Sequence, residues 1–211
     1  MLTAFRSISL RQVAEDDLPF LFRLFADPCR CHLWMHGRQV LDERGFHHAW
    51  SSWTTELMAA KFLVESAGRP VGLVFDYDRA PEDGYTKVTA LLDEEHVGHG
   101  AGVIAAALLV RWLFRTLPLR KVYLDVHGYN PSVVAMLRKL GLAEEGCLKN
   151  LRFWNGRYWD LHHFALEREA WPQVHDRLLR PRVVRSSRAG TPGAEREGRE
   201  EAVNGCLNGT A

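Results

Sequence analysis

A glycine-rich run between two apolar segments constrains this 211-residue chain more than any other feature. Residues 85–92 are typical of a strand, the loop after them holds Gly98, Gly100 and Gly102, and residues 103–114 are almost wholly apolar. This order predicts a strand, a tight loop and a largely buried helix. The first amides of a helix lack internal partners and carry partial positive charge, so the glycines would let a phosphate approach them closely.

Two common nucleotide-binding motifs do not describe this loop. No Lys-Ser or Lys-Thr pair follows the glycines, as it would in the ATP/GTP phosphate loop, and the spacing is not the Gly-x-Gly-x-x-Gly of dinucleotide folds. A phosphate-bearing cofactor is therefore expected. A plain tight loop and a nucleotide-binding enzyme of another kind both stay open at this point.

Hydrophobic periodicity predicts the other elements of the fold. The order strand, helix, strand between residues 85 and 127 implies a right-handed crossover between adjacent parallel strands. Asn155-Gly156 is a strong signal for a hairpin turn near the end of the fold. Further strands are expected at residues 7–13, 62–64, 71–77, 121–127, 151–154 and 158–166, and further helices at about 17–27, 42–58 and 131–141.

Composition limits the class of protein. Hydrophobic residues make up 46% and charged residues 25% of the chain, which is ordinary for a globular protein. Residues 1–181 hold 22 basic and 22 acidic side chains, and this balance argues against a broad nucleic-acid surface. The sequence contains no apolar run of membrane-spanning length and no signal-peptide pattern at its beginning, so a cytoplasmic location without a membrane partner is expected.

The cysteines are few and irregularly spaced, which favours reduced thiols over a disulfide framework. Cys29 and Cys31 lie close to His32 and His36, but the usual Cys-x-x-Cys spacing and a second ligand pair are missing from the sequence. No metal site is therefore predicted. Residues 182–211 are rich in Gly, Ser, Arg and Glu without periodicity, and they are expected to form a disordered tail after a linker or short helix at 173–181.

Three segments together resemble the GNAT acetyltransferase superfamily. Residues 97–102 are similar to its Gln/Arg-x-x-Gly-x-Gly/Ala loop, with Val97 where Gln or Arg is usual. Residues 126–142 resemble the strand end with its Asn and the following Lys-x-Gly-Phe, and residues 155–171 resemble the C-terminal hairpin of the branch that acetylates ribosomal-protein N-termini and spermidine. The resemblance covers residues 6–172.

The resemblance implies an α+β fold in one domain over residues 1–172, with a mostly antiparallel, seven-stranded splayed sheet flanked by helices. It implies acetyl-CoA as cosubstrate, bound between the strand that ends near Leu92 and the strand that ends near His127. A backbone N–H near Leu91 or Leu92 would polarise the thioester carbonyl. The implied cofactor-binding residues are Leu92, Val97, Gly98, His99, Gly100, Ala101, Gly102 and Asn130.

The usual proton-transfer groups of the family are missing from this sequence. Leu137 stands where a Tyr is common, Val133 where the ribosomal-protein enzymes have Ser, and Arg152 where they have a carboxylate. Asp125 and His127 share one face of the strand beside the expected cleft, and they are the candidate catalytic residues.

The resemblance therefore implies an N-acetyltransferase that transfers acetyl from acetyl-CoA directly to a primary amine. The acceptor is expected to be a small molecule or a protein N-terminus. Several tryptophans would suit an aromatic or cationic amine, although Trp50 and Trp53 are expected to be core residues. A homodimer is a further expectation. The alternative is a GNAT-fold protein that binds acyl-CoA as a sensor or scaffold, with weak or no catalysis.

Overall fold

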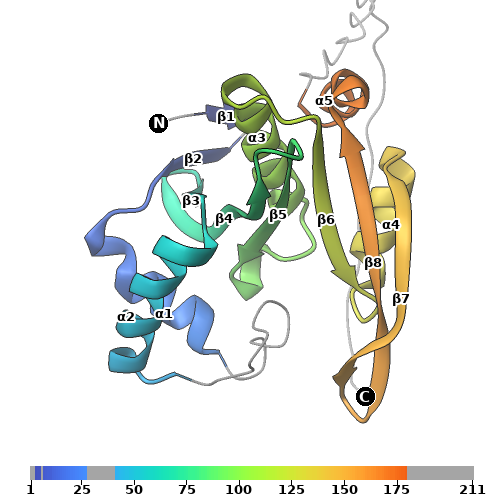
Figure 1. Ribbon diagram of the computed structural model, residues 1–211. Helices are drawn as coiled ribbons and strands as arrows, with labels where there is room; N and C mark the ends of the chain where they lie inside the picture. The colour runs from blue at the N-terminus through green and yellow to red at the C-terminus, as the bar shows by residue number, and fades with distance from the viewer. Residues whose placement is uncertain (1–2, 6, 28–40, 180–211) are drawn as a thin grey trace, which may run out of the picture. The chain divides into compact units, whose positions relative to one another are not determined.

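The computed structural model describes residues 3–5, 7–27 and 41–179. Its eight strands form one sheet in the order β1-β2-β3-β4-β5-β6-β8-β7 (Figure 1). The strands are β1 (Thr3–Phe5), β2 (Ile8–Gln12), β3 (Ala60–Ser66), β4 (Arg69–Ala80), β5 (Tyr85–Leu92), β6 (Lys121–His127), β7 (Ala143–Trp154) and β8 (Arg157–Glu167). The helices are α1 (Leu18–Ala26), α2 (Glu43–Ser52), α3 (Ala101–Thr116), α4 (Pro131–Leu140) and α5 (Trp171–Leu179).

The expected mixed sheet with flanking helices is confirmed. The seven expected strands correspond to β2–β8, and the three-residue β1 adds an eighth at one edge. The prediction that the last hairpin begins at Leu151 is wrong, because β7 starts at Ala143. β7 is the other edge strand, and most of its side chains are exposed. An edge strand of this kind lacks the apolar alternation from which a strand is recognised in sequence.

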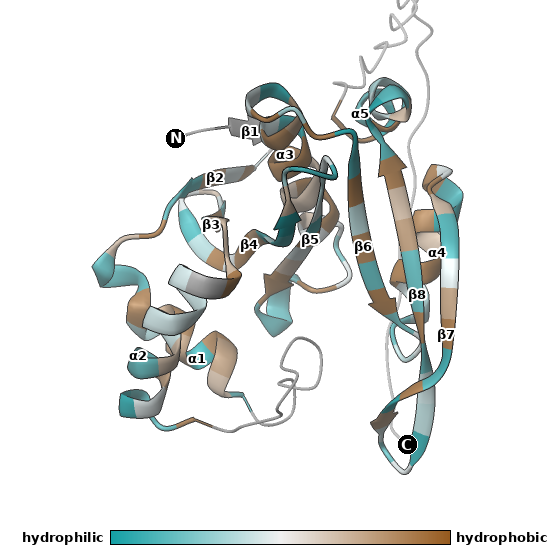
Figure 2. Ribbon diagram, viewed as in Figure 1, coloured by the Kyte–Doolittle hydropathy of each residue, from teal (hydrophilic) through white to brown (hydrophobic). Residues whose placement is uncertain are grey.

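Two apolar layers cover the two faces of the sheet. On one face α3, α4 and α5 pack against strand residues such as Val88 and Val126. On the other face α1 and α2 pack against residues such as Leu91. Val88 and Leu91 belong to the same strand, and their opposite burial follows from the alternation of side chains along it. Figure 2 shows the hydrophobic colour of α3 over much of its length, in agreement with its buried position between sheet and α5.

The aromatic residues of α2 belong to the second of these layers. Phe46 is fully buried, and its ring stacks on Trp50 with 5.9 Å between ring centroids. Trp53 begins a five-residue π-helical turn, and its ring lies 5.3 Å from that of Phe25 on α1. Trp50 and Trp53 therefore pack in the core, as expected. Within the described residues, none of the helices combines the length and the apolar character that crossing a bilayer requires.

The centre of the sheet is where the two middle strands separate. β5 and β6 are parallel, as expected, but they pair only at Tyr85–Lys121, Thr86–Val122 and Lys87–Tyr123. Beyond Lys87 each strand keeps its pairing on the outer side only, β5 with β4 and β6 with β8. The crossover between them is α3, which begins after the glycine-rich loop. The sheet is therefore interrupted between β5 and β6 at the end of β5 from which the glycine-rich loop continues.

Candidate active site

The glycine-rich loop connects β5 to α3 through a short 3-10 turn. Asp93 caps this turn, because its carboxylate accepts from the backbone N–H of His96 and lies 2.6 Å from the ring nitrogen Nδ1 of the same residue. Gly98 and Gly100 have φ values of 86° and 81°, a region that favours glycine. A Cβ added at either position would meet nothing within 4 Å. Glycine is therefore needed for the backbone conformation, and the space above the loop is open.

The loop ends at the N-terminus of α3, with Gly100 as the N-cap residue. The first backbone hydrogen bond of the helix runs from the N–H of Ile104 to the carbonyl of Gly100. The amides before Ile104 belong to the first turn, where helix geometry provides no internal acceptor. α3 is 16 residues long, so its aligned peptide dipoles add positive potential at this end. The arrangement suits a phosphate or another anion.

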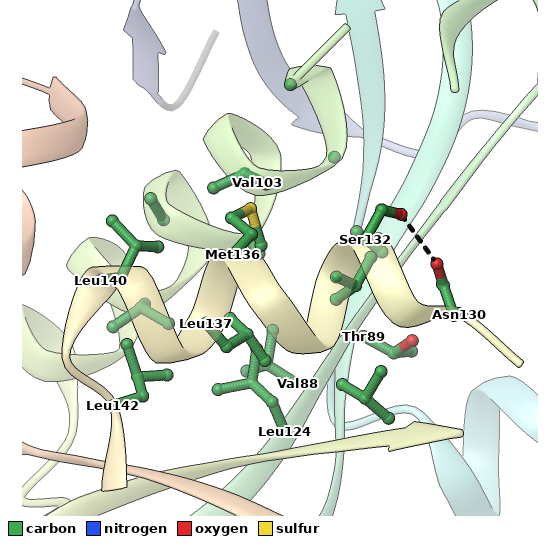
Figure 3. A pocket seen from close by; sticks show the side chains of 18 of the residues that line it. Val88, Thr89, Val103, Leu124, Asn130, Ser132, Met136, Leu137, Leu140 and Leu142 are labelled. Atoms are coloured by element: carbon green, nitrogen blue, oxygen red, sulfur yellow. Dashed lines mark hydrogen bonds between the residues drawn. The ribbon is translucent and has the colours of Figure 1, made fainter. Parts of the chain in front are cut away.

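A cavity of about 510 Å³ lies between the separated parts of β5 and β6 and continues to the loop. Its walls are mainly apolar side chains from both strands, α3 and α4. Figure 3 shows α4 along the cavity, with Met136, Leu137 and Leu140 on one side and Val88 and Leu124 on the strands opposite. The apolar lining of the cavity suits a flexible organic chain, with an anion site at its mouth.

Most of the residues predicted from the sequence line this cavity. They are Leu92, Val97, Gly98, Gly100, Gly102, Asn130, Asp125 and His127. Two predicted cofactor residues, His99 and Ala101, are not among the lining residues. Ala101 is buried and His99 is exposed. Val97 is 51% exposed at the cavity mouth, so its side chain adds an apolar surface there.

Asn130 is the N-cap residue of α4, and its side-chain oxygen accepts a hydrogen bond of 3.3 Å from Ser132 (Figure 3). Ser132, Thr89 and Tyr129 also line the cavity, and sequence reasoning did not select them. Their signal was weak, because a hydroxyl near a helix start or on a strand is ordinary outside its three-dimensional context. Leu137 and Val133 stand at the positions where the resemblance implies Tyr and Ser. Both line the cavity wall, and both are apolar.

Asp125 is held by polar partners on the α1/α2 face of the sheet. One of its carboxylate oxygens accepts a hydrogen bond from Nδ1 of His163 on β8, and the other lies 3.2 Å from the Lys87 ammonium. Lys87 also pairs with Asp78 at 3.1 Å. Burial lowers the pKa of Lys87, but the hydrogen bond to Asp78 and the charge of Asp125 outweigh it and raise the pKa above its ordinary value. Lys87 is therefore protonated at neutral pH.

Next to this group, burial raises the pKa of Tyr77 above its ordinary value, with Asp125 and Asp78 adding to the effect. Tyr77 is a neutral phenol, and its ring lies 5.8 Å from the Lys87 ammonium. His127 lies two residues beyond Asp125 on the same side of β6, and its ring is 4.9 Å from that of Tyr129. Both candidate catalytic residues therefore line the cavity.

One cluster of possible metal ligands occurs among the described residues. Glu144, Cys147 and His162 bring ligand atoms within 4.8 Å of one another on β7 and β8. Glu144 already binds His162 at 2.6 Å and Arg138 at 2.7 Å, and the hydrogen bond from His162, followed by that from Arg138, lowers its pKa. Cys147 is a free thiol. The predicted group of Cys29, Cys31, His32 and His36 lies outside the described residues, as does Cys206.

Comparison with known proteins assigns the family. The sequence model of the acetyltransferase (GNAT) domain matches residues 7–143. Among curated proteins, the chain is 28% identical over 112 residues to the SPbeta prophage-derived uncharacterized N-acetyltransferase YokL of Bacillus subtilis, covering 53% of this chain and 63% of that protein. It is 33% identical over 98 residues to the spermidine N(1)-acetyltransferase of Escherichia coli K12, covering 46% and 53%. The chain thus matches less than two thirds of the length of these two relatives.

Among solved structures, the spermidine N-acetyltransferase of Vibrio cholerae in complex with CoA and spermine superimposes with a TM-score of 0.70. The identity is 23%, and the superposition covers 79% of this chain and 98% of that one. At this identity the likeness concerns the fold. It agrees with the match of the family model.

Proposed function

Because the chain belongs to the GNAT acetyltransferase family, we propose that it is an N-acetyltransferase that uses acetyl-CoA and a primary amine. One observation carries the proposal: the cavity between β5 and β6 opens at the glycine-rich N-terminus of α3. An apolar channel that ends at an anion site has the chemistry of a pantetheine arm attached to a diphosphate. The CoA-bound relative has the same fold.

The residues present fit acetyl-CoA. The amides that follow Gly98 and Gly100 would hold the diphosphate, and the walls formed by β5, β6 and α4 would enclose the arm. When bound, acetyl-CoA supplies an acetyl group activated as a thioester. Asp93 donates its N–H to the carbonyl of Val71 on β4, and N–H groups alternate in direction along a strand. The N–H of Leu92 therefore points toward β6, where it would stabilise negative charge on the carbonyl oxygen.

The acceptor amine would enter from the α1/α2 face of the sheet. Asp125, His127 and Tyr77 lie on this face of the central strands, while the opposite face is covered by α3 and α4. An amine attacks a thioester only when it is neutral, so a group near the cavity has to accept a proton. We propose Asp125 and His127 as the catalytic residues on this side. The acceptor class is a small-molecule amine or a protein N-terminus.

The proposal also includes a cytoplasmic location, a homodimer and independence from metal ions. These expectations come from the sequence pattern and the family resemblance, and they are tested by fractionation, light scattering and chelation respectively. Two of the relatives named above are spermidine N-acetyltransferases by name, which makes a polyamine the first acceptor to examine.

The second candidate function is that of an acyl-CoA-binding sensor. The specific observation in its favour is that Leu137 and Val133 line the cavity wall, so neither of these two positions carries a hydroxyl that could protonate the departing thiolate. In that case the cavity would bind acetyl-CoA tightly without transfer.

The two functions are separated by measuring CoA release with a panel of acceptors. The panel contains spermidine, phenethylamine and a short peptide with a free N-terminus. Saturable release with one acceptor, reduced about 100-fold by His127→Ala or Asp125→Ala, is the expected result. The sensor is favoured instead if calorimetry detects acetyl-CoA binding while no acceptor releases CoA above the rate of spontaneous hydrolysis.

A further inference from the structure

His163 on β8 forms a pair with Asp125 that the sequence alone does not reveal. The antiparallel register of β6 and β8 places Asp125 opposite His163, although the two residues are 38 positions apart. His162, the neighbour in sequence, lies opposite Val126 on the other face of the sheet. Of these two histidines, only His163 therefore faces the side from which an amine would enter.

The contacts of Asp125 determine what it can do. One oxygen accepts from the His163 ring, and the other lies beside the protonated Lys87. Both oxygens of this carboxylate are therefore engaged by neighbouring side chains. Such a carboxylate is well suited to orient the imidazole. An ionised carboxylate can only accept hydrogen bonds, so the proton of neutral His163 must be on Nδ1, which leaves the lone pair of Nε2 available.

The surroundings of His163 fix its ring further. The ring stacks on Tyr123 with 4.4 Å between centroids and an interplanar angle of 24°. On β7, the pKa of Glu145 is lowered mainly by the hydrogen bond from Lys121 and to a lesser degree by His163. Glu145 is thus engaged by Lys121 at 2.6 Å. Asp125 remains the carboxylate that holds His163, whose side chain is 30% exposed.

We propose that His163, oriented by the cavity-lining Asp125, accepts through a bridging water the proton that the acceptor amine loses during acetyl transfer. This inference rests on the proposed function. The N–C bond to the acetyl group forms as the thioester C–S bond breaks. The proton released from nitrogen moves to Nε2 of His163, and the CoA thiolate takes a proton from solvent. In this assignment Asp125 acts through His163 as a positioning residue, which replaces the direct catalytic role proposed for it above, and the Lys87 ammonium holds its second oxygen.

The test compares His163→Gln and Asp125→Asn with the control His162→Gln, whose side chain lies on the opposite face of the same strand. With the best acceptor of the panel, kcat is expected to fall about 100-fold in His163→Gln and about 10-fold or more in Asp125→Asn. The acetyl-CoA Kd stays unchanged in both. The acid limb of the pH profile of kcat/KM is expected to disappear in His163→Gln and to persist in the control.

A second measurement does not depend on turnover. In ¹⁵N-labelled full-length protein, long-range nitrogen–proton correlation spectra are expected to show His163 as the Nδ1–H tautomer in the wild type. In Asp125→Asn this preference is expected to be lost. A wild-type His163 in the Nε2–H form contradicts the assignment whatever the activity.

The kinetic outcomes separate the two levels of the proposal. If the wild type transfers acetyl and His163→Gln keeps kcat within about threefold between pH 6 and 9, the role of His163 is wrong and the proposed function stands. If the wild type binds acetyl-CoA and transfers to none of the acceptors, the proposed function fails and the role of His163 fails with it.

Discussion

At the scale of single residues, the ion pair of Arg11 and Asp17 makes stability depend on pH. Asp17 is buried, and both of its oxygens bind the Arg11 guanidinium, at 2.6 and 2.7 Å. The hydrogen bond from Arg11 is the largest cause of the lowered pKa of Asp17. Because the folded pKa is below the unfolded value of about 4, the stabilisation is present above pH 4 and is lost as the pH falls.

Asp17→Asn is therefore expected to lower the free energy of unfolding by about 1–2 kcal/mol at pH 7, a figure reduced for the partial exposure of Arg11. The difference from the wild type should shrink as the pH falls from 6 toward 3. Urea unfolding at a series of pH values measures it. Asp16→Asn, at the exposed neighbouring position, is the matched control. An equal loss at pH 7 and pH 3 would exclude this electrostatic origin.

Residues also mark the limit of what the sequence could predict about the site. Gly98 and Gly100 were recognisable because a positive φ restricts the residue type at those positions. The contact between Asp125 and His163 was not, because it depends on the register between β6 and β8. A shift of one residue would place the opposite face of β8 beside Asp125. Register is set by packing over the whole sheet, which a local pattern does not contain.

At the scale of elements, the glycine-rich loop has a matched control within the same chain. Gly98 and Gly100 have φ values of 86° and 81°, and Gly68 in the turn between β3 and β4 has 78°. A Cβ at any of the three would meet nothing within 4 Å. Alanine at each position should therefore cause a similar backbone strain of about 1 kcal/mol. Only the loop positions line the cavity, whereas Gly68 does not.

We expect Gly98→Ala and Gly100→Ala to weaken acetyl-CoA binding by about tenfold or more, because a methyl group and a distorted backbone would keep a diphosphate from the amides of α3. Gly68→Ala should lower the free energy of unfolding by the same amount as the two loop variants, and it should bind acetyl-CoA as tightly as the wild type. Calorimetry and urea unfolding on the three variants measure both quantities. Normal binding by the two loop variants would show that the loop does not hold the cofactor.

Some helices and strands can be predicted from a sequence pattern more completely than others. α3 and β5 were predictable because both are buried, so their apolar residues follow helix and strand periods. The first part of β7 was missed because an exposed edge strand has no apolar face. The strand is irregular near Asn150, where φ is positive and the register with β8 shifts. The sequence pattern therefore did not show that residues 143–149 and the segment from Leu151 onward belong to one strand.

At the scale of the whole molecule, a bound acetyl-CoA would connect parts of the fold that otherwise touch little. It would contact the loop before α3 and the separated ends of β5 and β6, which share only three residue pairs. A ligand that binds only the folded state stabilises it by about 2.7 kcal/mol at a concentration of 100 Kd. For a domain of 150–250 residues this corresponds to a rise in Tm of about 5–10 °C.

The two halves of the ligand should each do much less than the whole. S-acetylpantetheine occupies the channel without a diphosphate, and ADP supplies the diphosphate without the arm, so each makes only part of the contacts. We expect acetyl-CoA to raise Tm by the full amount in a thermal unfolding series, and equal concentrations of either half to raise it by about 2 °C or less. ATP and NAD are the remaining comparisons. A rise with either of them that equals or exceeds the rise with acetyl-CoA would mean that the glycine-rich loop serves a nucleotide, and that the channel between β5 and β6 has another occupant.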